Sequence, residues 1–198
     1  MYEKLLERPL LYNTWSLIHF TPRLNAIKQV LQGKNQPLIL DLGCGTGLLK
    51  KNFPQCKYTG IDTNRYYITY AKQRLTGRFI LGDILALERL PIREHFDFIV
   101  LNGVLHHMDN SMAAQLLSSL GNYLHESGKI IVIDHLYTDT LNPINKILLK
   151  GDRGSFSRTE IEYRTLFKIF PVVSYISFDI KAGPVILWKQ VRYVLSCN

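Results

Sequence analysis

Three glycines at alternate positions, Gly43, Gly45 and Gly47, give this chain its clearest chemical signal. They follow a short apolar run that begins at Leu38 and is broken once, by Asp41, as is typical of a buried parallel strand. Glycine adopts a positive φ without strain and lets the backbone approach a ligand closely. A strand that leads through such a turn into a helix is the nucleotide-binding corner of a doubly wound sheet. The acid on the strand favours a ligand that carries a cationic group.

The spacing of these glycines separates two classes of nucleotide site. A dinucleotide fingerprint would read Gly-x-Gly-x-x-Gly, but Leu48 stands where that fingerprint needs its third glycine. The chain also lacks a Tyr-x-x-x-Lys hydride apparatus, which argues against a nicotinamide dehydrogenase. The segment from Asp41 to Gly47 instead resembles motif I, D-x-G-x-G-x-G, of the class I S-adenosylmethionine-dependent methyltransferases, and it matches throughout. The resemblance continues motif by motif to about residue 135.

The resemblance implies that residues at later strand ends hold the same cofactor. Asp62 ends the second predicted strand, where an acid accepts hydrogen bonds from ribose hydroxyls; alternatively, it only favours the start of the next helix. After the third strand, the family places an acid on the adenine amine and an apolar residue on the ring, although Gly82-Asp83 could be a simple turn. The expected cofactor-binding residues are Asp41, Gly43, Cys44, Gly45, Asp62, Thr63, Asp83, Ile84 and Asn102.

Three histidines are candidates for catalysis: His106 and His107 after the fourth strand, and His135 after the fifth. Neighbouring residues on a helix point about 100° apart, so the adjacent pair cannot easily act on one atom. One ring could serve as a general base near neutral pH; the alternative is that each ring only makes structural hydrogen bonds. The implied methyl donor is itself electrophilic, so a base is needed only when the acceptor must lose a proton.

Two special classes of methyltransferase do not fit the residues after the fourth strand. DNA adenine and protein glutamine methyltransferases carry an Asn-Pro-Pro-Tyr type signature there, and the run from Asn102 to Met108 lacks it. Catechol-type enzymes carry a metal-binding set of acids near the fourth and fifth strands, of which Asp134-His135 is at most a fragment. We therefore expect no metal.

The acceptor is expected to be held by segments outside the motifs. Tyr12 and Trp15 come from the N-terminal segment, and Tyr137 and Arg153 come from the loop after the fifth strand. The alternative for these aromatic residues is permanent packing on the sheet. Because the chain has no large insertion, the acceptor is expected to be a small molecule.

The N-terminal segment is expected to act as a mobile cap over the acceptor. Pro9 and Pro22 should break it into short helical pieces, since proline interrupts a helix. A cap would help to keep the site dry and the reactants aligned.

Composition and charge narrow the class of protein. The chain has 198 residues, of which 46% are hydrophobic and 20% charged, as in an ordinary globular domain. Its net charge of +8 is dispersed, so a nucleic acid partner is not favoured. No apolar run approaches the roughly 18 residues of a membrane span. Three scattered cysteines form neither a metal spacing nor a disulfide framework, and we expect a reducing cytoplasm.

The order of predicted elements is helices first, then alternating strands and helices. It predicts a doubly wound, mostly parallel α/β sheet of seven strands, with the last antiparallel, helices on both faces and an N-terminal helical cap. We expect a single domain over residues 1–198, with the cap at 1–36 and a Rossmann-like core at 37–198. The predicted strands are 38–42, 58–62, 79–81, 96–101, 129–134, 172–180 and 185–195. The predicted helices are 3–8, 11–19, 25–31, 46–52, 64–75, 111–125 and one opened by a capping box at 157–160.

Together these residues predict an enzyme that transfers a methyl group from S-adenosylmethionine to a small-molecule acceptor, without metal and by in-line displacement, leaving S-adenosylhomocysteine. Two alternatives stay open. An RNA methyltransferase would carry the same motifs, and so would a non-catalytic subunit that keeps the methyl donor site. Turnover on a panel of acceptors distinguishes the last from an enzyme.

Overall fold

The computed structural model describes residues 9–138 and 156–197, and for residues 10–19 it describes the backbone but not the side chains. The strands, in chain order, are β1 (Leu38–Leu42), β2 (Lys57–Asp62), β3 (Arg78–Leu81), β4 (Phe96–Asn102), β5 (Leu124–His135), β6 (Val172–Ala182) and β7 (Val185–Ser196). The helices are α2 (Pro9–Leu31), α3 (Leu48–Asn52), α4 (Arg65–Arg74), α5 (Asn110–Leu120) and α7 (Glu160–Leu166). Short 3₁₀ turns are η1 (Ile84–Arg89), η2 (Leu105–His107) and η3 (Gly121–Tyr123).

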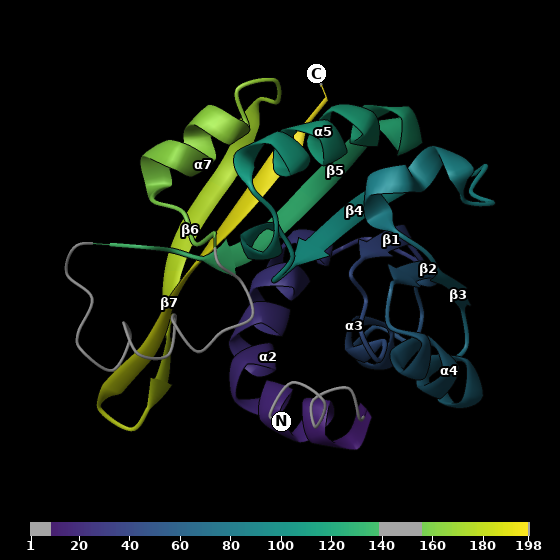
Figure 1. Ribbon diagram of the computed structural model, residues 1–198, viewed down its shortest axis with the longest axis horizontal. Coiled ribbons are helices and arrows are strands. Elements are labelled where there is room, and N and C mark those ends of the chain that lie inside the picture. Colours follow the sequence, from purple (N-terminus) through teal and green to yellow (C-terminus); the bar gives the residue numbers. More distant parts are fainter. Residues whose placement is uncertain (1–8, 139–155, 198) are drawn as a thin grey trace.

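The strands form one seven-stranded sheet in the order β3-β2-β1-β4-β5-β7-β6 (Figure 1). Strands β1 to β5 pair in parallel, and β7 lies antiparallel between β5 and β6. The first strand, β1, lies in the middle of the sheet. β2 and β3 extend the sheet to one side of β1, and β4 then pairs with the other side of β1. This arrangement confirms the predicted fold class, including the antiparallel last strand.

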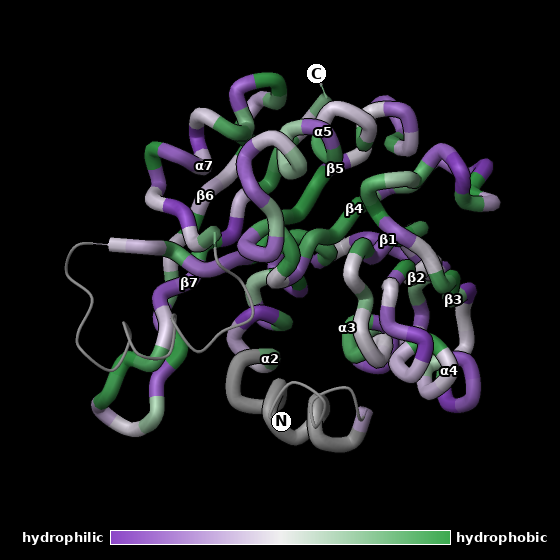
Figure 2. The backbone as a smooth tube through the Cα atoms, viewed as in Figure 1, coloured by the Kyte–Doolittle hydropathy of each residue, from purple (hydrophilic) through white to green (hydrophobic). Residues whose placement is uncertain are grey.

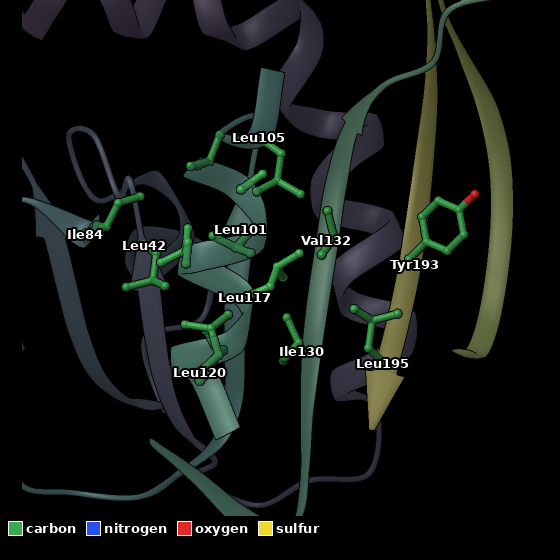
Figure 3. Packing of buried hydrophobic residues seen from close by; sticks show 14 of the residues in the cluster. Leu42, Ile84, Leu101, Leu105, Leu117, Leu120, Ile130, Val132, Tyr193 and Leu195 are labelled. Atoms are coloured by element: carbon green, nitrogen blue, oxygen red, sulfur yellow. The ribbon is translucent and has the colours of Figure 1, made fainter. Parts of the chain in front are cut away.

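The sheet has a hydrophobic core on each face. Each central strand contributes side chains to both cores because its side chains alternate between the faces. In β1, Leu40 and Leu42 face one core and Ile39 faces the other. Helices α5 and α7 cover the first core, where Leu42, Leu101 and Val132 pack with residues of α5 (Figure 3). Helices α2, α3 and α4 cover the second. Because both faces are covered there, β4 and residues 130–133 of β5 are mostly hydrophobic (Figure 2).

The parallel strands end at one edge of the sheet. β1, β2, β3, β4 and β5 end at Leu42, Asp62, Leu81, Asn102 and His135. Ligands of open α/β sheets bind beyond this carboxyl edge, so the expected cofactor and catalytic residues are brought to one side of the molecule.

Helix α2 is continuous from Pro9 to Leu31, and the predicted break at Pro22 is wrong. Pro9 is the first helical residue, a position that proline suits because its missing N–H is not needed there. Pro22 lies inside the helix, where it removes one hydrogen bond. The loss is tolerated because Ile27 and Leu31, on the following turns, are buried in the second core, and tertiary packing supplies most helical stability. Residues 3–8 lie outside the described part.

Buried polar contacts also tie the second half of α2 to the sheet. Arg192 of β7 donates to the Ala26 carbonyl at 3.1 Å and to Gln29 Oε1 at 3.1 Å. Arg23 Nε donates to Gln190 Oε1 at 3.0 Å. This half is therefore packed on the sheet, as the alternative to a mobile cap proposes. Among the described residues, no helix has the length and apolarity needed to cross a membrane.

Two predicted boundaries also differ from the structure. The helix predicted to reach His125 ends at Leu120, because Leu124 already pairs with Phe96 as part of β5. The capping box uses Thr159 and Glu162, not the Ser157–Glu160 pair that shares the same spacing. Arg158 forms a β-bridge with Leu136, which keeps the backbone extended just before Thr159. The N-cap is therefore Thr159 and not the predicted Ser157.

We predict that Ile27→Ala lowers the free energy of unfolding by roughly 2–5 kcal/mol, the usual cost of emptying a buried aliphatic site. Lys28→Ala, at the next and exposed position of α2, is the matched control and should change stability by less than about 0.5 kcal/mol. Urea unfolding of both variants measures the difference. Equal stability of the two variants would mean that α2 does not belong to the core.

Candidate functional site at the carboxyl edge of the sheet

The glycine turn after β1 has the backbone that its composition predicts. Gly43, Gly45 and Gly47 have φ values of +73°, +55° and +77°. The amides of Gly43 and Cys44 both donate to the Ile61 carbonyl of β2 at 2.9 Å, which holds the turn against the neighbouring strand. A Cβ added to Gly43 would lie 2.7 Å from a methyl group of Val104. No residue with a side chain fits that position without displacing its neighbours.

Asp62 is joined directly to this turn. Its Oδ2 accepts from the Gly45 amide at 2.8 Å, and its Oδ1 accepts from the Asn64 amide at 2.7 Å. Burial raises the pKa of the carboxyl group, and the two backbone hydrogen bonds oppose that rise. Each oxygen keeps a second lone pair, which could accept from a ligand hydroxyl. Thr63 beside it is exposed, and Asn64 caps α4 as predicted.

Asp41 lies on β1 between Gly60 and Val100, and only 3% of its surface is exposed. Its Oδ2 accepts a hydrogen bond from the Tyr58 hydroxyl at 2.6 Å. Burial raises its pKa to about 7, despite the opposing hydrogen bond from Tyr58. A cationic ligand group nearby would restore the charged form, since an opposite charge favours ionisation.

The remaining expected cofactor residues differ in how open they are. Asp83 is exposed and its Oδ1 accepts from the Leu85 amide at 2.9 Å, which is the turn role considered as its alternative. Ile84 is 8% exposed and packs in the first core. Asn102 ends β4, and its Oδ1 is buried with no hydrogen-bond partner among the described residues. A buried unpaired acceptor is costly, so this oxygen suits a ligand that donates to it.

Two of the three candidate histidines are buried and lie side by side. His106 lies in η2 after β4, and its Nδ1 is 2.5 Å from Oδ1 of Asp134. The His106 amide also donates to Asp134 Oδ2, at 3.0 Å. Burial alone would raise the pKa of Asp134, but the charge of His106 and its hydrogen bond lower it. An ionised Asp134 keeps the proton of His106 on Nδ1, as in other carboxylate–histidine pairs.

Both ring nitrogens of His135 face hydrogen-bond donors. Arg23 Nε donates to Gln190 Oε1, so the Gln190 amide group faces His135 Nδ1, at 2.7 Å. The other ring nitrogen, Nε2, lies 3.4 Å from Nη2 of Arg23, which can only donate. The rings of His106 and His135 meet edge to face, with centroids 4.7 Å apart. A Cβ on Gly103 would lie 2.6 Å from Arg23 Nη1, which places the guanidinium over the end of β4.

His106, Asp134 and His135 also form a group whose possible metal-ligand atoms lie within 4.8 Å of one another. Two histidines and a carboxylate can hold a transition metal. Here His106 Nδ1 and Asp134 share a proton, and His135 Nε2 lies 3.4 Å from the Arg23 guanidinium. A cation at this point would have to displace that proton and tolerate a neighbouring positive charge. The donor set therefore favours a proton network over a metal site.

The other predicted residues lie apart from this centre or outside the described part. His107 is exposed, although the centroid of its ring lies 4.1 Å from that of His106. Tyr137 is 39% exposed, and its amide donates to the Arg158 carbonyl. The side chains of Tyr12 and Trp15, and the whole of Arg153, are not described.

Sequence reasoning did not assign four residues that complete this centre: Arg23, Asp134, Arg158 and Gln190. Only Asp134 carried a signal, because it ends the fifth strand beside a histidine. The others reach the centre from α2, from the segment before α7 and from β7 through contacts that no spacing along the chain reveals.

A hollow of about 570 Å³ lies elsewhere, at the opposite edge of the sheet. Its lining includes Lys28, Lys34, Pro37 and Cys56, which come from the end of α2 and the segments before β1 and β2. It contains none of the expected site residues, and nothing connects it with the chemistry at the carboxyl edge.

We predict that Gly45→Val reduces affinity for S-adenosylhomocysteine to below detection. A β-branched residue at φ +55° is strained, and the change disturbs the amide that holds Asp62. Gly33→Val is the matched control, because Gly33 has φ +79°, open space around its Cβ position and no place in the site. Titration calorimetry should find binding intact in the control. Normal binding by a folded Gly45→Val protein would show that the turn does not contact the ligand.

We predict that Asp41→Asn changes stability and binding in opposite directions. The folded-state pKa of Asp41 is raised, so its favourable contribution is complete below its unfolded pKa of 3.8 and is lost as pH rises towards 7. The loss is about 1.4 kcal/mol per pH unit in that window. Asparagine cannot ionise and still accepts from Tyr58, so the unliganded variant should exceed wild type in stability by more at pH 8 than at pH 5. Urea unfolding measures this difference, and a constant difference would mean that Asp41 folds in its ionised form.

The same variant should bind S-adenosylhomocysteine at least about tenfold more weakly at pH 8, because a charge-assisted contact is lost. Calorimetry on the protein used for unfolding measures this affinity. Unchanged affinity would place Asp41 outside the ligand site.

Comparison with known proteins places these features in a family. Residues 39–128 match the model of a methyltransferase domain. An uncharacterized methyltransferase of Alkaliphilus oremlandii is 32% identical over 117 residues, which cover 58% of this chain and 53% of the relative. A malonyl-[acyl-carrier protein] O-methyltransferase of Halalkalibacterium halodurans is 31% identical, over 50% of this chain and 39% of the relative. A ribosomal RNA small subunit methyltransferase C of Haemophilus ducreyi is 32% identical, over 50% and 32%. The chain thus spans about half or less of the length of these relatives.

Solved structures agree on the fold. The magnesium protoporphyrin IX methyltransferase of Synechocystis PCC 6803, solved with bound SAH, superimposes with a TM-score of 0.68 at 17% identity, over 88% of this chain and 82% of that one. The resemblance seen in the glycine motif is confirmed. Residues 39–128 match the methyltransferase-domain family, and the chain has the class I, Rossmann-like fold of S-adenosylmethionine-dependent methyltransferases.

Proposed function

We propose that this chain binds S-adenosylmethionine at the glycine turn and transfers its methyl group to a small-molecule acceptor without a metal. The observation that carries the proposal is the junction of Gly45 and Asp62 beside the unpaired Oδ1 of Asn102. These groups lie at the ends of three adjacent strands, and their polarity fits a ligand with hydroxyl groups and a cationic group. Relatives in the family and a neighbour solved with SAH support it.

Each site residue has a role that follows from its chemistry. Asp62 would accept from the ribose hydroxyls, and Asp83 with Ile84 would border the adenine. Asp41 and Asn102 would face the positively charged amino acid part of the ligand. When bound, the sulfonium supplies an electrophilic methyl group, and the protein has to align the acceptor and exclude water.

His106 is the residue that we propose as general base. Asp134 holds its Nδ1 proton, so Nε2 is the atom left to take a proton from the acceptor, and Asp134 would stabilise the resulting imidazolium. His135 has a donor beside each ring nitrogen, from Gln190 and Arg23, and is not the base that we propose. This division of roles does not involve the exposed His107.

The acceptor is not set by the shared domain. The relatives carry names that specify a malonyl acyl-carrier protein and ribosomal RNA, and the structural neighbour acts on a porphyrin. We favour a small molecule because the positive charge of the chain is dispersed. The similarity to a ribosomal RNA methyltransferase keeps RNA as the second candidate.

The test has two stages. Titration calorimetry with S-adenosylmethionine and S-adenosylhomocysteine should show binding that EDTA does not change, because the site residues contact the ligand without a metal. Failure to bind either ligand would overturn the proposal. Binding that is seen without EDTA and is lost when EDTA is added would overturn the metal-free part of the proposal.

Turnover is then measured with radiolabelled S-adenosylmethionine on a panel of hydroxylated and carboxylic small molecules and on ribosomal RNA. We predict that His106→Gln lowers kcat by roughly 10²–10⁴-fold on the accepted substrate, the usual contribution of a general base. His107→Gln, at the exposed neighbour, should leave it unchanged. Equal rates in the two variants would remove the base from the mechanism, and turnover on RNA alone would replace the small-molecule acceptor.

A further inference from the structure

Arg158 is a buried arginine outside the matched domain, and the mechanism above does not use it. It is 3% exposed and lies just before α7. Arginine is seldom fully buried unless its polar groups are paired. Its burial therefore needs a reason.

The reason is a set of four hydrogen bonds, three of which go to the segment that carries His106. Nη1 donates to the Leu105 carbonyl at 2.7 Å, and Nη2 donates to the Met108 carbonyl at 2.6 Å. Nε donates to Asn110 Oδ1 at 2.8 Å, and Nη1 also reaches the Phe156 carbonyl at 3.2 Å. The guanidinium thus spans the 3₁₀ turn η2 and the first residue of α5.

The backbone around Arg158 reinforces this clamp. The Phe156 amide donates to the His106 carbonyl at 3.0 Å. Leu136, which directly follows β5, bridges to Arg158. One short segment thereby joins the loop after β4 to the end of β5, the two places that supply His106 and Asp134.

The contact between His106 and Asp134 depends on this link between the loop after β4 and the end of β5. Asp134 accepts from both the amide and the ring of His106, so the loop must keep its backbone and its side chain in register with β5 at once. We propose that Arg158 is a positioning residue of the methyl transfer, which acts by holding the loop so that His106 stays on Asp134. This inference rests on the proposed function of His106.

The role is geometric, not an ion pair. All four hydrogen-bond acceptors of Arg158 among the described residues are neutral oxygens. Reaching them together needs the planar fork of a guanidinium, which the single ammonium of lysine cannot reproduce. Arg158→Lys should therefore fail to hold the loop that carries His106. If positive charge alone were required, this variant would hold the loop as wild type does.

The experiment compares Arg158→Lys and Arg158→Met with Arg164→Met. Arg164 is exposed on α7, where it pairs with Glu160 and lies over the half-buried Tyr175 ring, so its loss controls for removing an arginine from this region. The first measurement is NMR of histidine-labelled full-length protein with saturating S-adenosylhomocysteine. Wild type and Arg164→Met should show a low-field Nδ1 proton of His106, assigned by its loss in His106→Gln. Both Arg158 variants should shift or lose it.

Binding and turnover complete the test. Affinity for S-adenosylhomocysteine should stay within about twofold of wild type in all three variants, because Arg158 shares no contact with the glycine turn. On the accepted substrate, kcat should fall by at least about tenfold in both Arg158 variants with little change in KM, as expected when a reacting group is misplaced.

The outcomes separate the two proposals. An unchanged His106 proton in Arg158→Lys overturns the positioning role, and so does wild-type kcat in that variant. A shifted proton with wild-type kcat in both His106→Gln and the Arg158 variants shows that His106 itself is not the base. If wild type does not bind S-adenosylhomocysteine, the proposed function fails. In that case the NMR measurement of the His106 Nδ1 proton is repeated without ligand, and it still decides whether Arg158 holds His106. If Arg158→Met does not fold, Arg158→Lys decides alone.

Discussion

One buried carboxylate organises the part of the site that we propose to be catalytic. Asp134 has no exposed surface, and an ionised group in such a place must be compensated by hydrogen bonds and opposite charge. It accepts from the amide and ring of His106 and from the amide of His135. The need to satisfy this one charge fixes where the loop after β4 meets the end of β5. Arg158 and Gln190 then secure the two histidines from the outside.

The site has two halves that are built differently. The half proposed to hold the methyl donor is local: the turn after β1 binds to the end of β2, and its contacts join residues about 17 positions apart, as between Gly45 and Asp62. The half proposed to hold the acceptor gathers residues from across the chain, with contacts such as Arg23 to Gln190 spanning 167 positions. The first half depends on a short glycine motif, and the second depends on how strands and helices pack at the carboxyl edge.

Stability and function compete at Asp41. A carboxyl group at the centre of a parallel sheet is costly to ionise, and its raised pKa expresses that cost. The same property prepares it for a cation, because a positively charged ligand recovers the energy that burial withholds. Asn102 shows the neutral form of the same principle, since its buried oxygen lacks a partner among the described residues. Both positions are poor choices for a fold alone and reasonable ones for a binding site.

The sequence by itself determined the glycine turn, the acids at the ends of the strands and the class of the sheet, mostly parallel with its last strand antiparallel. These features follow from local chemistry: glycine alone tolerates the φ of the turn, and alternating strands and helices have few ways to pack. Local signals failed where tertiary contacts outweighed them. Pro22 did not end α2 because packing of Ile27 held the helix, and the segment before α7 stayed extended because Arg158 bridges to Leu136. Only the tertiary structure decided which histidines are buried, which groups their ring nitrogens meet, and that Arg23, Arg158 and Gln190 lie beside them. Those properties depend on hydrogen bonds between residues distant in the chain, and their partners leave no pattern in the spacing of residues.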